Sequence, residues 1–284
     1  YLMPLKWLPG GTQLEKWWIR CEKHEGLSPS DRAKHHTSRV QTRPPNDSLL
    51  RLKNALRSAE SDTVTTPSKG ARDAAGRFGT LANKIRRPWH NFADPGLRGN
   101  ASPNNEPVWR VVDRARLLDL ETFQNKVYAV LEFRGDDFVP HQVRRIVGTA
   151  LAITHEWLPF DAFDLLTRRD VLVQTPLAPM GHLCLNGVRF HFDELRTNGR
   201  GVFDSNVDGL VVEYGAVPVR NRSRILEHLL MNLSDKNVQR LEDMWLQELR
   251  DTIAPGIRAR LGHSLQASMP FGNASILGAT NVVK

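Results

Sequence analysis

The chain has 284 residues with 40% apolar content, which is enough for one or two domains with a hydrophobic core. A formal charge of +8 and a pI near 9.8 favour a polyanionic partner, although a basic surface alone would have the same composition. No apolar run reaches transmembrane length and two cysteines cannot form a disulfide framework, so no membrane span and no secreted disulfide scaffold are expected.

These features predict an intracellular protein, with the mitochondrion favoured over the nucleus. The first residue is Tyr1 and not methionine. We therefore expect the sequence to begin inside a longer protein or after processing.

Residues 1–45 are rich in Pro, Gly, Ser, His and basic residues, and this composition predicts a basic, loop-rich arm. Two stretches are exceptions, because residues 1–8 could form a strand and residues 14–21 carry tryptophans that could anchor on a partner. A metal site could be drawn from four residues, but their spacing matches no common zinc module; they are Cys21, His24, His35 and His36. No metal site and no cofactor are expected.

The region 46–195 begins with residues 49–59, whose apolar spacing predicts a short amphipathic helix capped near Asp47. Residues 61–79 are turn-rich. Residues 84–92 then interleave cations with aromatic rings, a combination that binds phosphates and stacks on unpaired bases. A solvated charge run beside a core aromatic would have the same pattern. The candidate RNA contacts here are Lys84, Arg86, Arg87, Trp89 and His90.

Two segments alternate with a period of two and predict strands. Residues 109–117 place Trp109 and Val111 on one face and three arginines on the other, where the arginines meet either solvent or phosphate; they are Arg110, Arg114 and Arg116. Residues 127–134 form the second strand, with Val127, Ala129, Leu131 and Phe133 on one side.

Residues 138–151 predict a helix, because Val143, Ile146 and Val147 recur at helical spacing with Ala150 and Leu151. Arg144 lies just beside this stripe, and His141 and Gly148 lie about one turn to either side of it. A glycine inside a helix costs about 1 kcal/mol relative to alanine, so its presence indicates that another part of the chain approaches closely. His141 and Arg145 are further candidate RNA contacts.

The remaining elements are a second short helix over residues 158–168, and a strand over 182–192 with a bulge at Asn186 and Gly187. This order predicts an α+β fold in which helices cover one face of an antiparallel sheet. Residues 196–284 predict a C-terminal helical extension and tail. Its helices are expected over 224–233 and 238–253, with Pro255 and Gly256 after the second and an extended tail from Gly262. The expected buried stripe of the second helix is Val238, Leu241, Trp245, Leu249 and Ile253.

Two motifs together resemble the TruA family of tRNA pseudouridine synthases, and in particular its eukaryotic-type branch. The first is His-Gln-Val-Arg-Arg-Ile-Val-Gly at 141–148, and the second is Ala-Pro-Met-Gly-His-Leu-Cys-Leu at 178–185. The triplet His90-Asn91-Phe92 and the hairpin over 108–134 fit in the same order. The resemblance covers residues 85–195, and it implies that 46–195 form the second half of a pseudouridine synthase domain.

The resemblance implies a role for two residues. Arg144 matches the arginine that pairs with the family's catalytic aspartate, and Leu183 matches a leucine that packs against the flipped base. His182 stands where the family has glycine, which changes the shape of the pocket. The family's Arg-Thr-Asp motif does not occur in the sequence. Asp73, in Arg72-Asp73-Ala74, lacks the threonine and falls at the wrong place, so we interpret it as an ordinary loop carboxylate.

Two functions from different classes are consistent with these features. The first is an RNA pseudouridine synthase, acting on tRNA or another structured RNA, whose catalytic aspartate lies outside these residues. The second is a non-catalytic homologue that binds structured RNA, such as rRNA, in a ribonucleoprotein or ribosome assembly. Both predict RNA as the partner. A nucleotide-phosphate enzyme is excluded, since neither glycine-loop motif is present.

Overall fold

The computed structural model of the chain describes residues 1–25, 44–62, 84–94, 108–185, 188–191, 211–214, 230–231, 233 and 235–267. The elements in chain order are β1 (Leu2–Pro4), η1 (Leu5–Trp7), α1 (Gly11–Glu25), α3 (Ser48–Ser58), β2 (Arg87–Pro88), η3 (His90–Phe92), β3 (Trp109–Arg110), β4 (Val112–Phe123), β5 (Lys126–Gly135), α5 (Gln142–Thr154), α6 (Ala162–Leu166), β6 (Val188–His191), β7 (Val211–Tyr214), α8 (Lys236–Glu248), the π-helical turn η7 (Leu249–Ile253) and α9 (Ala254–Ala267).

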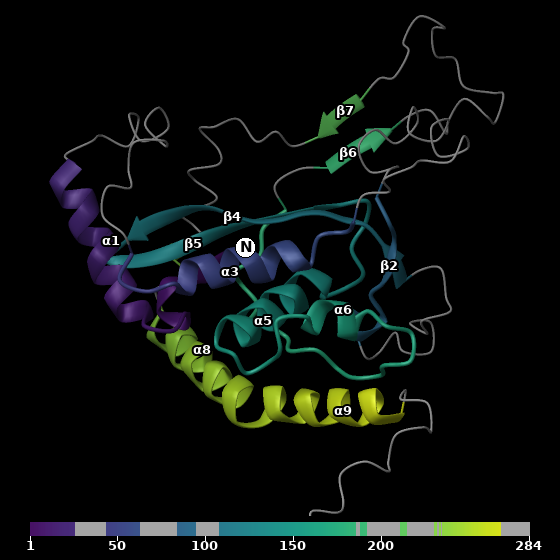
Figure 1. Cartoon of the computed structure of the whole chain (residues 1–284). Helices are drawn as coiled ribbons and strands as arrows, with labels where there is room; N and C mark the ends of the chain where they lie inside the picture. Colours follow the sequence, from purple (N-terminus) through teal and green to yellow (C-terminus); the bar gives the residue numbers. More distant parts are fainter. Residues whose placement is uncertain are drawn as a thin grey trace, which may run out of the picture.

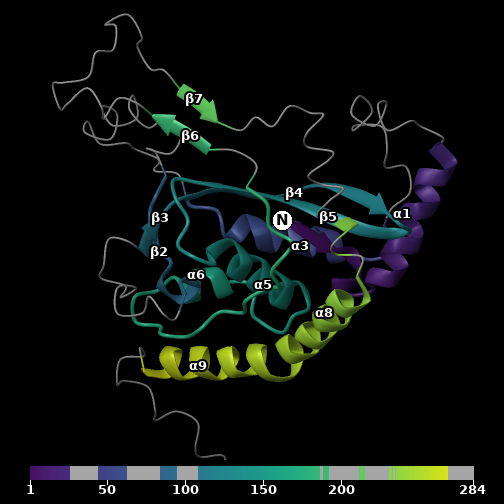
Figure 2. The same cartoon turned by 180° about the vertical axis from the view of Figure 1, so that it is seen from behind.

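The centre of the fold is an antiparallel sheet in the order β1-β5-β4, and α3 and α5 lie against one of its faces (Figure 1). Helices α8 and α9 run along the far side of α5, as the view from behind also shows (Figure 2). Two further antiparallel pairs, β2-β3 and β6-β7, complete the described strands. The predicted α+β class, with helices on one face of an antiparallel sheet and a C-terminal helical part, is confirmed.

The hairpin of β4 and β5 turns at Gln124 and Asn125, both of which have positive φ. Two central residues of this kind match the twist of the flanking strands. On β5, the alternation predicted from sequence holds, since Val127, Ala129 and Leu131 all join the main core. On β4 the pairing with β5 shifts register between Val112 and Arg114 and again between Leu117 and Asp119, and the first shift interrupts the simple alternation predicted for residues 109–117.

The other face of the sheet is covered in part by the chain just before α8. Leu230 and Leu233 pack there with Leu2 and Tyr128, and these four buried side chains form a second apolar cluster. Burial raises the pKa of Tyr128 to about 12, so its hydroxyl stays neutral. Both faces of the sheet near β1 are therefore closed to water.

Gly148 lies where α5 meets the segment 176–185. A Cβ at this position would stand 2.6 Å from the carbonyl oxygen of Pro176 and 3.0 Å from the Pro176 Cβ. The close approach predicted from a glycine inside a helix is confirmed. It lets the backbone of 176–178 lie directly on the helix.

We expect Gly148→Ala to lower the free energy of unfolding by about 1–3 kcal/mol, because the added methyl must displace backbone. Gly256→Ala in α9 is the control, since nothing lies within 4 Å of its Cβ position and alanine is the better helix former. Urea denaturation should show the first variant destabilised and the second unchanged or more stable. Equal stability of the two variants would contradict the close approach.

The first 25 residues differ from the predicted loop-rich arm. The strand expected within residues 1–8 is present as β1, but η1 and the 15-residue helix α1 follow it. Leu5, Trp7 and Leu14 are fully buried in the main core. Pro9 and Gly10 lie in the turn between η1 and α1, where Gly10 has φ +65°.

The C-terminal part differs from the prediction in three ways. The helix expected over 238–253 continues through η7 into α9, and Pro255 lies just after the π-helical turn, where the regular hydrogen bonds of the α-helix are already interrupted. The helix also reaches Ala267, beyond the predicted start of the tail. Leu241, predicted to be buried, is 64% exposed, and the neighbouring Glu242 is buried in its place.

Elsewhere, the helix predicted over 49–59 is confirmed as α3, whereas the one over 158–168 is reduced to the five residues of α6. The strand predicted over 182–192 begins only at Val188. Several predicted features lie outside the described residues: the bulge of this strand, most of the helix over 224–233, and the side chains Asp73, His35 and His36. Within the described helices, no stretch is both long and apolar enough to cross a bilayer.

Candidate functional site

Arg144 projects from the first turn of α5 and is half-buried. Its Nε donates a hydrogen bond to the carbonyl oxygen of Ala178 at 2.7 Å. The main-chain N–H of Ala178 in turn donates to the carbonyl of Arg144 at 3.3 Å. The two sequence motifs at 141–148 and 178–185 are thereby joined through one residue.

His141, immediately before α5, orients the same guanidinium. Its Nδ1 lies 3.4 Å from Nη1 of Arg144, and its Nε2 lies 2.9 Å from Oδ2 of Asp94. Since an arginine can only donate and a carboxylate can only accept, one neutral tautomer, with the proton on Nε2, satisfies both contacts. His141 has φ +69°, a conformation that costs a non-glycine residue free energy and often marks a functional position.

Burial disfavours the charge on Arg144. Loss of water lowers the pKa of its guanidinium, and the nearby Tyr1 acts in the opposite direction. A guanidinium has five N–H donors, and the contacts with Ala178 and His141 use only some of them. A carboxylate from elsewhere would therefore be stabilised here, both by hydrogen bonds and by an uncompensated positive charge.

The segment 176–185 carries apolar side chains at the surface beside Arg144. Leu183 is 45% exposed, and Met180 and Leu185 are more exposed still. The hydroxyl of Tyr1 donates to the carbonyl of Pro179 at 3.1 Å, and burial raises the pKa of Tyr1 well above its usual range, so this donor keeps its proton. Arg144, which is hydrogen-bonded to Ala178, is thus attached to the same segment that carries Leu183.

The predicted RNA contacts divide into exposed and buried groups. Arg86, Arg114 and Arg116 have side chains about half-exposed, each near a single carboxylate. Lys84 is partly buried and donates to the carbonyl of Ser61. The more enclosed Arg87 and Arg110 are tied to aspartates, with Arg87 bound to both Asp62 and Asp164 and Arg110 lying 3.4 Å from Asp137.

Three other predicted contacts lie inside the fold and do not reach the surface. Trp89 is fully buried and donates from Nε1 to the carbonyl of Arg110. His90 is 7% exposed and contacts the carbonyl of Val171 through Nε2. Arg145 is 1% exposed and donates to the carbonyl of Thr175. All three hold chain segments together.

Asp94, Tyr1 and Glu242 contribute to this region without having been predicted. Asp94 follows the His90-Asn91-Phe92 triplet by two residues, and that proximity was the available signal. Asn91 supports the same area, since its side chain donates to the carbonyls of Leu166 and Val171. Glu242 was not predicted to be buried, because it is charged and lies outside the apolar stripe expected for residues 238–253.

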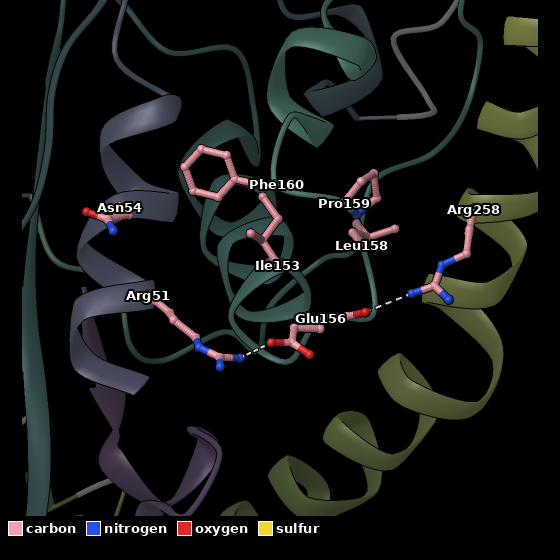
Figure 3. Close-up of a pocket in the computed structure, with 8 residues that line it drawn as sticks. All are labelled: Arg51, Asn54, Ile153, Glu156, Leu158, Pro159, Phe160 and Arg258. Atoms are coloured by element: carbon pink, nitrogen blue, oxygen red, sulfur yellow. Dashed lines mark hydrogen bonds and ion pairs between the residues drawn. The ribbon is translucent and has the colours of Figure 1, made fainter. Parts of the chain in front are cut away.

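A pocket of about 540 Å³ lies at the other end of α5, between α3 and α9 (Figure 3). Its two arginines already have partners, since Arg51 pairs with the Glu156 carboxylate and Arg258 donates to the carbonyls of Glu156 and Trp157. We interpret the pocket as structural, because its arginines attach α3 and α9 to the residues that follow α5. Within the described ranges, no group of three or more His, Cys, Asp or Glu side chains could hold a metal ion.

No family model matches the chain. Two curated proteins from strains of Chloroflexus aurantiacus, each named tRNA pseudouridine synthase A, are similar to it, with 32% identity over 112 residues. The matched part is 39% of this chain and 39% of each relative, so the chain covers about two fifths of their length. This similarity supports the resemblance to the TruA family that the motifs indicated.

Proposed function

We propose that the chain is the arginine-bearing half of a TruA-type pseudouridine synthase of the eukaryotic-type branch, acting on uridine in tRNA. The observation that carries the proposal is Arg144, a half-buried guanidinium held by Ala178 and by the Asp94-His141 pair. The partial similarity to proteins named tRNA pseudouridine synthase A supports the same function. The motif at 141–148 supports the branch.

In this proposal the uridine leaves the helical stack before chemistry, as a base must when an enzyme acts on it. The uracil is detached from its ribose, turned, and rejoined through carbon, which requires a carboxylate at the base. Arg144 keeps that carboxylate ionised and oriented through charge and hydrogen bonds. Leu183 packs against the base. The carboxylate comes from outside the 284 residues, since no Arg-Thr-Asp occurs among them.

RNA attachment in this proposal rests on the exposed cations. Arg114 and Arg116 extend from β4, and Arg86 lies just before β2. Their carboxylate partners are no closer than 3.4 Å, and exposed pairs of this kind are weak enough to exchange for phosphate. Binding through such contacts weakens steeply as salt rises.

The proposal predicts that the natural protein, with any residues that precede Tyr1, forms pseudouridine in tRNA transcripts. Rejoining through C5 expels the hydrogen there, so release of tritium from [5-³H]uridine-labelled tRNA measures the reaction. Residues 1–284 alone should release none. If these residues turn over alone, the aspartate lies within them and Asp73 is the first to replace. If the natural protein is inactive, the isomerase proposal is wrong, and a non-catalytic RNA-binding role replaces it.

A further inference from the structure

His182 is a large polar side chain with 0% exposure in the middle of the apolar segment 176–185. It makes two hydrogen-bond contacts with the main chain of Leu2 in β1. Its carbonyl accepts from the Leu2 N–H at 2.8 Å, and its Nδ1 lies 2.6 Å from the Leu2 carbonyl. Because a carbonyl can only accept, Nδ1 carries a proton. The segment is thus attached to the sheet at this one residue by main chain and side chain together.

Glu242 of α8 meets the other nitrogen of the same ring. Its Oε1 lies 2.9 Å from Nε2 of His182, at ion-pair distance although not aligned as a hydrogen bond. The carboxylate is 2% exposed, and its second oxygen is 3.8 Å from Lys6 Nζ. The two buried groups are therefore in direct polar contact, and the Glu242 carboxylate lies closer to His182 than to Lys6. A buried acid of this kind is retained only where it is paired.

Two aromatic rings pack on the imidazole of His182, and a third packs on one of these two. The Tyr1 ring stacks on His182 at 5.3 Å, and Trp7 of η1 lies 5.0 Å from it at a tilt of 53°. Trp245 of α8 packs on Trp7 at 5.2 Å. This arrangement leaves the imidazole little room to move. A change at Glu242 is therefore transmitted to β1 and to the segment 176–185 rather than absorbed locally.

We propose that His182 and Glu242 are a positioning pair. Through this pair the C-terminal helix α8 sets the position of Leu183, and of the Ala178 carbonyl that holds Arg144, at the base-binding site. The inference rests on the proposed function. It makes the C-terminal helices a structural part of the site. It also accounts for a histidine at the position where the TruA motif has glycine, since the imidazole is what reaches α8.

The test compares variants of the natural protein in the tritium-release assay. In His182→Asn the amide can replace Nδ1 toward Leu2 but cannot reach Glu242, and Glu242→Ala removes the partner. Each should lower kcat about tenfold with little change in KM, and the double variant should be no worse than either alone. Glu242→Gln should retain most of kcat, since its amide can donate to Nε2. Asp243→Asn is the matched control, because this exposed neighbour pairs with the same Lys6.

A second readout does not depend on turnover. 4-Thiouridine placed at the target position of tRNA should crosslink to residues 176–185 in the wild-type protein and in Glu242→Gln, and much less in Glu242→Ala and His182→Asn. Circular dichroism should show every variant folded at the assay temperature. If wild type crosslinks without turnover, the isomerase proposal fails while the pair stands. Wild-type crosslinking or kcat in both His182→Asn and Glu242→Ala, or no crosslink in wild type, would overturn the positioning role.

Discussion

Replacing Arg144 by alanine in the natural protein should lower pseudouridine formation by at least about a hundredfold, comparable to the loss of a group that stabilises charge in a transition state. RNA affinity should change little, since the residue is half-buried and its contacts are with Ala178 and His141. Arg144→Lys should also be poor, because a single ammonium cannot reproduce a planar fork that binds on two sides. Tritium release and filter binding on the same tRNA measure the two quantities.

The control for this experiment is Arg114→Ala. Arg114 is more exposed and lies 3.8 Å from Asp113, and it belongs to the strand face assigned to RNA attachment. Its loss should weaken RNA binding modestly and leave the maximal rate near that of the wild type. Thermal melting should show that both variants fold, since Arg144→Ala removes one hydrogen bond to a backbone carbonyl. A wild-type rate in Arg144→Ala would show that the residue serves only to hold 176–185.

Local patterns were sufficient for the elements whose burial follows a simple period. The stripe of α5, the alternation of β5 and the helix α3 were all predicted, because each places a periodic set of apolar side chains in the main core. The burial of α5 on its other sides as well was not predicted, since it depends on tertiary contacts. Gly148 was predicted to permit a close approach, although the approaching backbone of Pro176 is 28 positions away in sequence and no local signal names it.

The sequence did not predict which of two adjacent residues is buried. Arg144 and Arg145 are adjacent and chemically identical, yet one is half-buried at the candidate site and the other is 1% exposed beneath it. The difference depends on where 175–178 crosses α5, which is a tertiary contact. Glu242 and Leu241 show the same effect on α8, because Glu242 is buried by a partner, His182, that is 60 positions away. Pairing across the fold overrides residue type here.

The pattern of segment 84–92 fits either an RNA contact or a charged surface beside a core aromatic residue. The burial of its rings distinguishes the two interpretations. Cations interleaved with aromatic rings suggested base stacking, but the Trp89 ring packs edge-on against Phe92 at 4.8 Å, and Phe92 stacks on Phe163 at 5.8 Å. A stacking platform for a base must be exposed. Trp89 is fully buried, so its contribution is to the core, and the exposed Arg86 is the candidate of this segment for an RNA contact.

Trp89→Ala should therefore lower the free energy of unfolding by about 3–5 kcal/mol, the usual cost of emptying a large aromatic site in a core. The lost hydrogen bond to the Arg110 carbonyl adds to this cost, since that bond ties η3 to β3. RNA affinity per folded molecule should not change. Urea denaturation gives the stability, and binding is measured at a urea concentration where both proteins remain folded.

Arg86→Glu is the matched variant, three residues away on the same segment. Its exposed side chain makes only a 3.5 Å contact with Asp136, so stability should scarcely change. RNA affinity should fall, and the slope of its logarithm against the logarithm of salt concentration should shrink by about one. If Trp89→Ala instead weakens RNA binding at unchanged stability while Arg86→Glu has no effect, the tryptophan must leave the core to meet RNA, and the division of this segment into a buried and an exposed half is wrong.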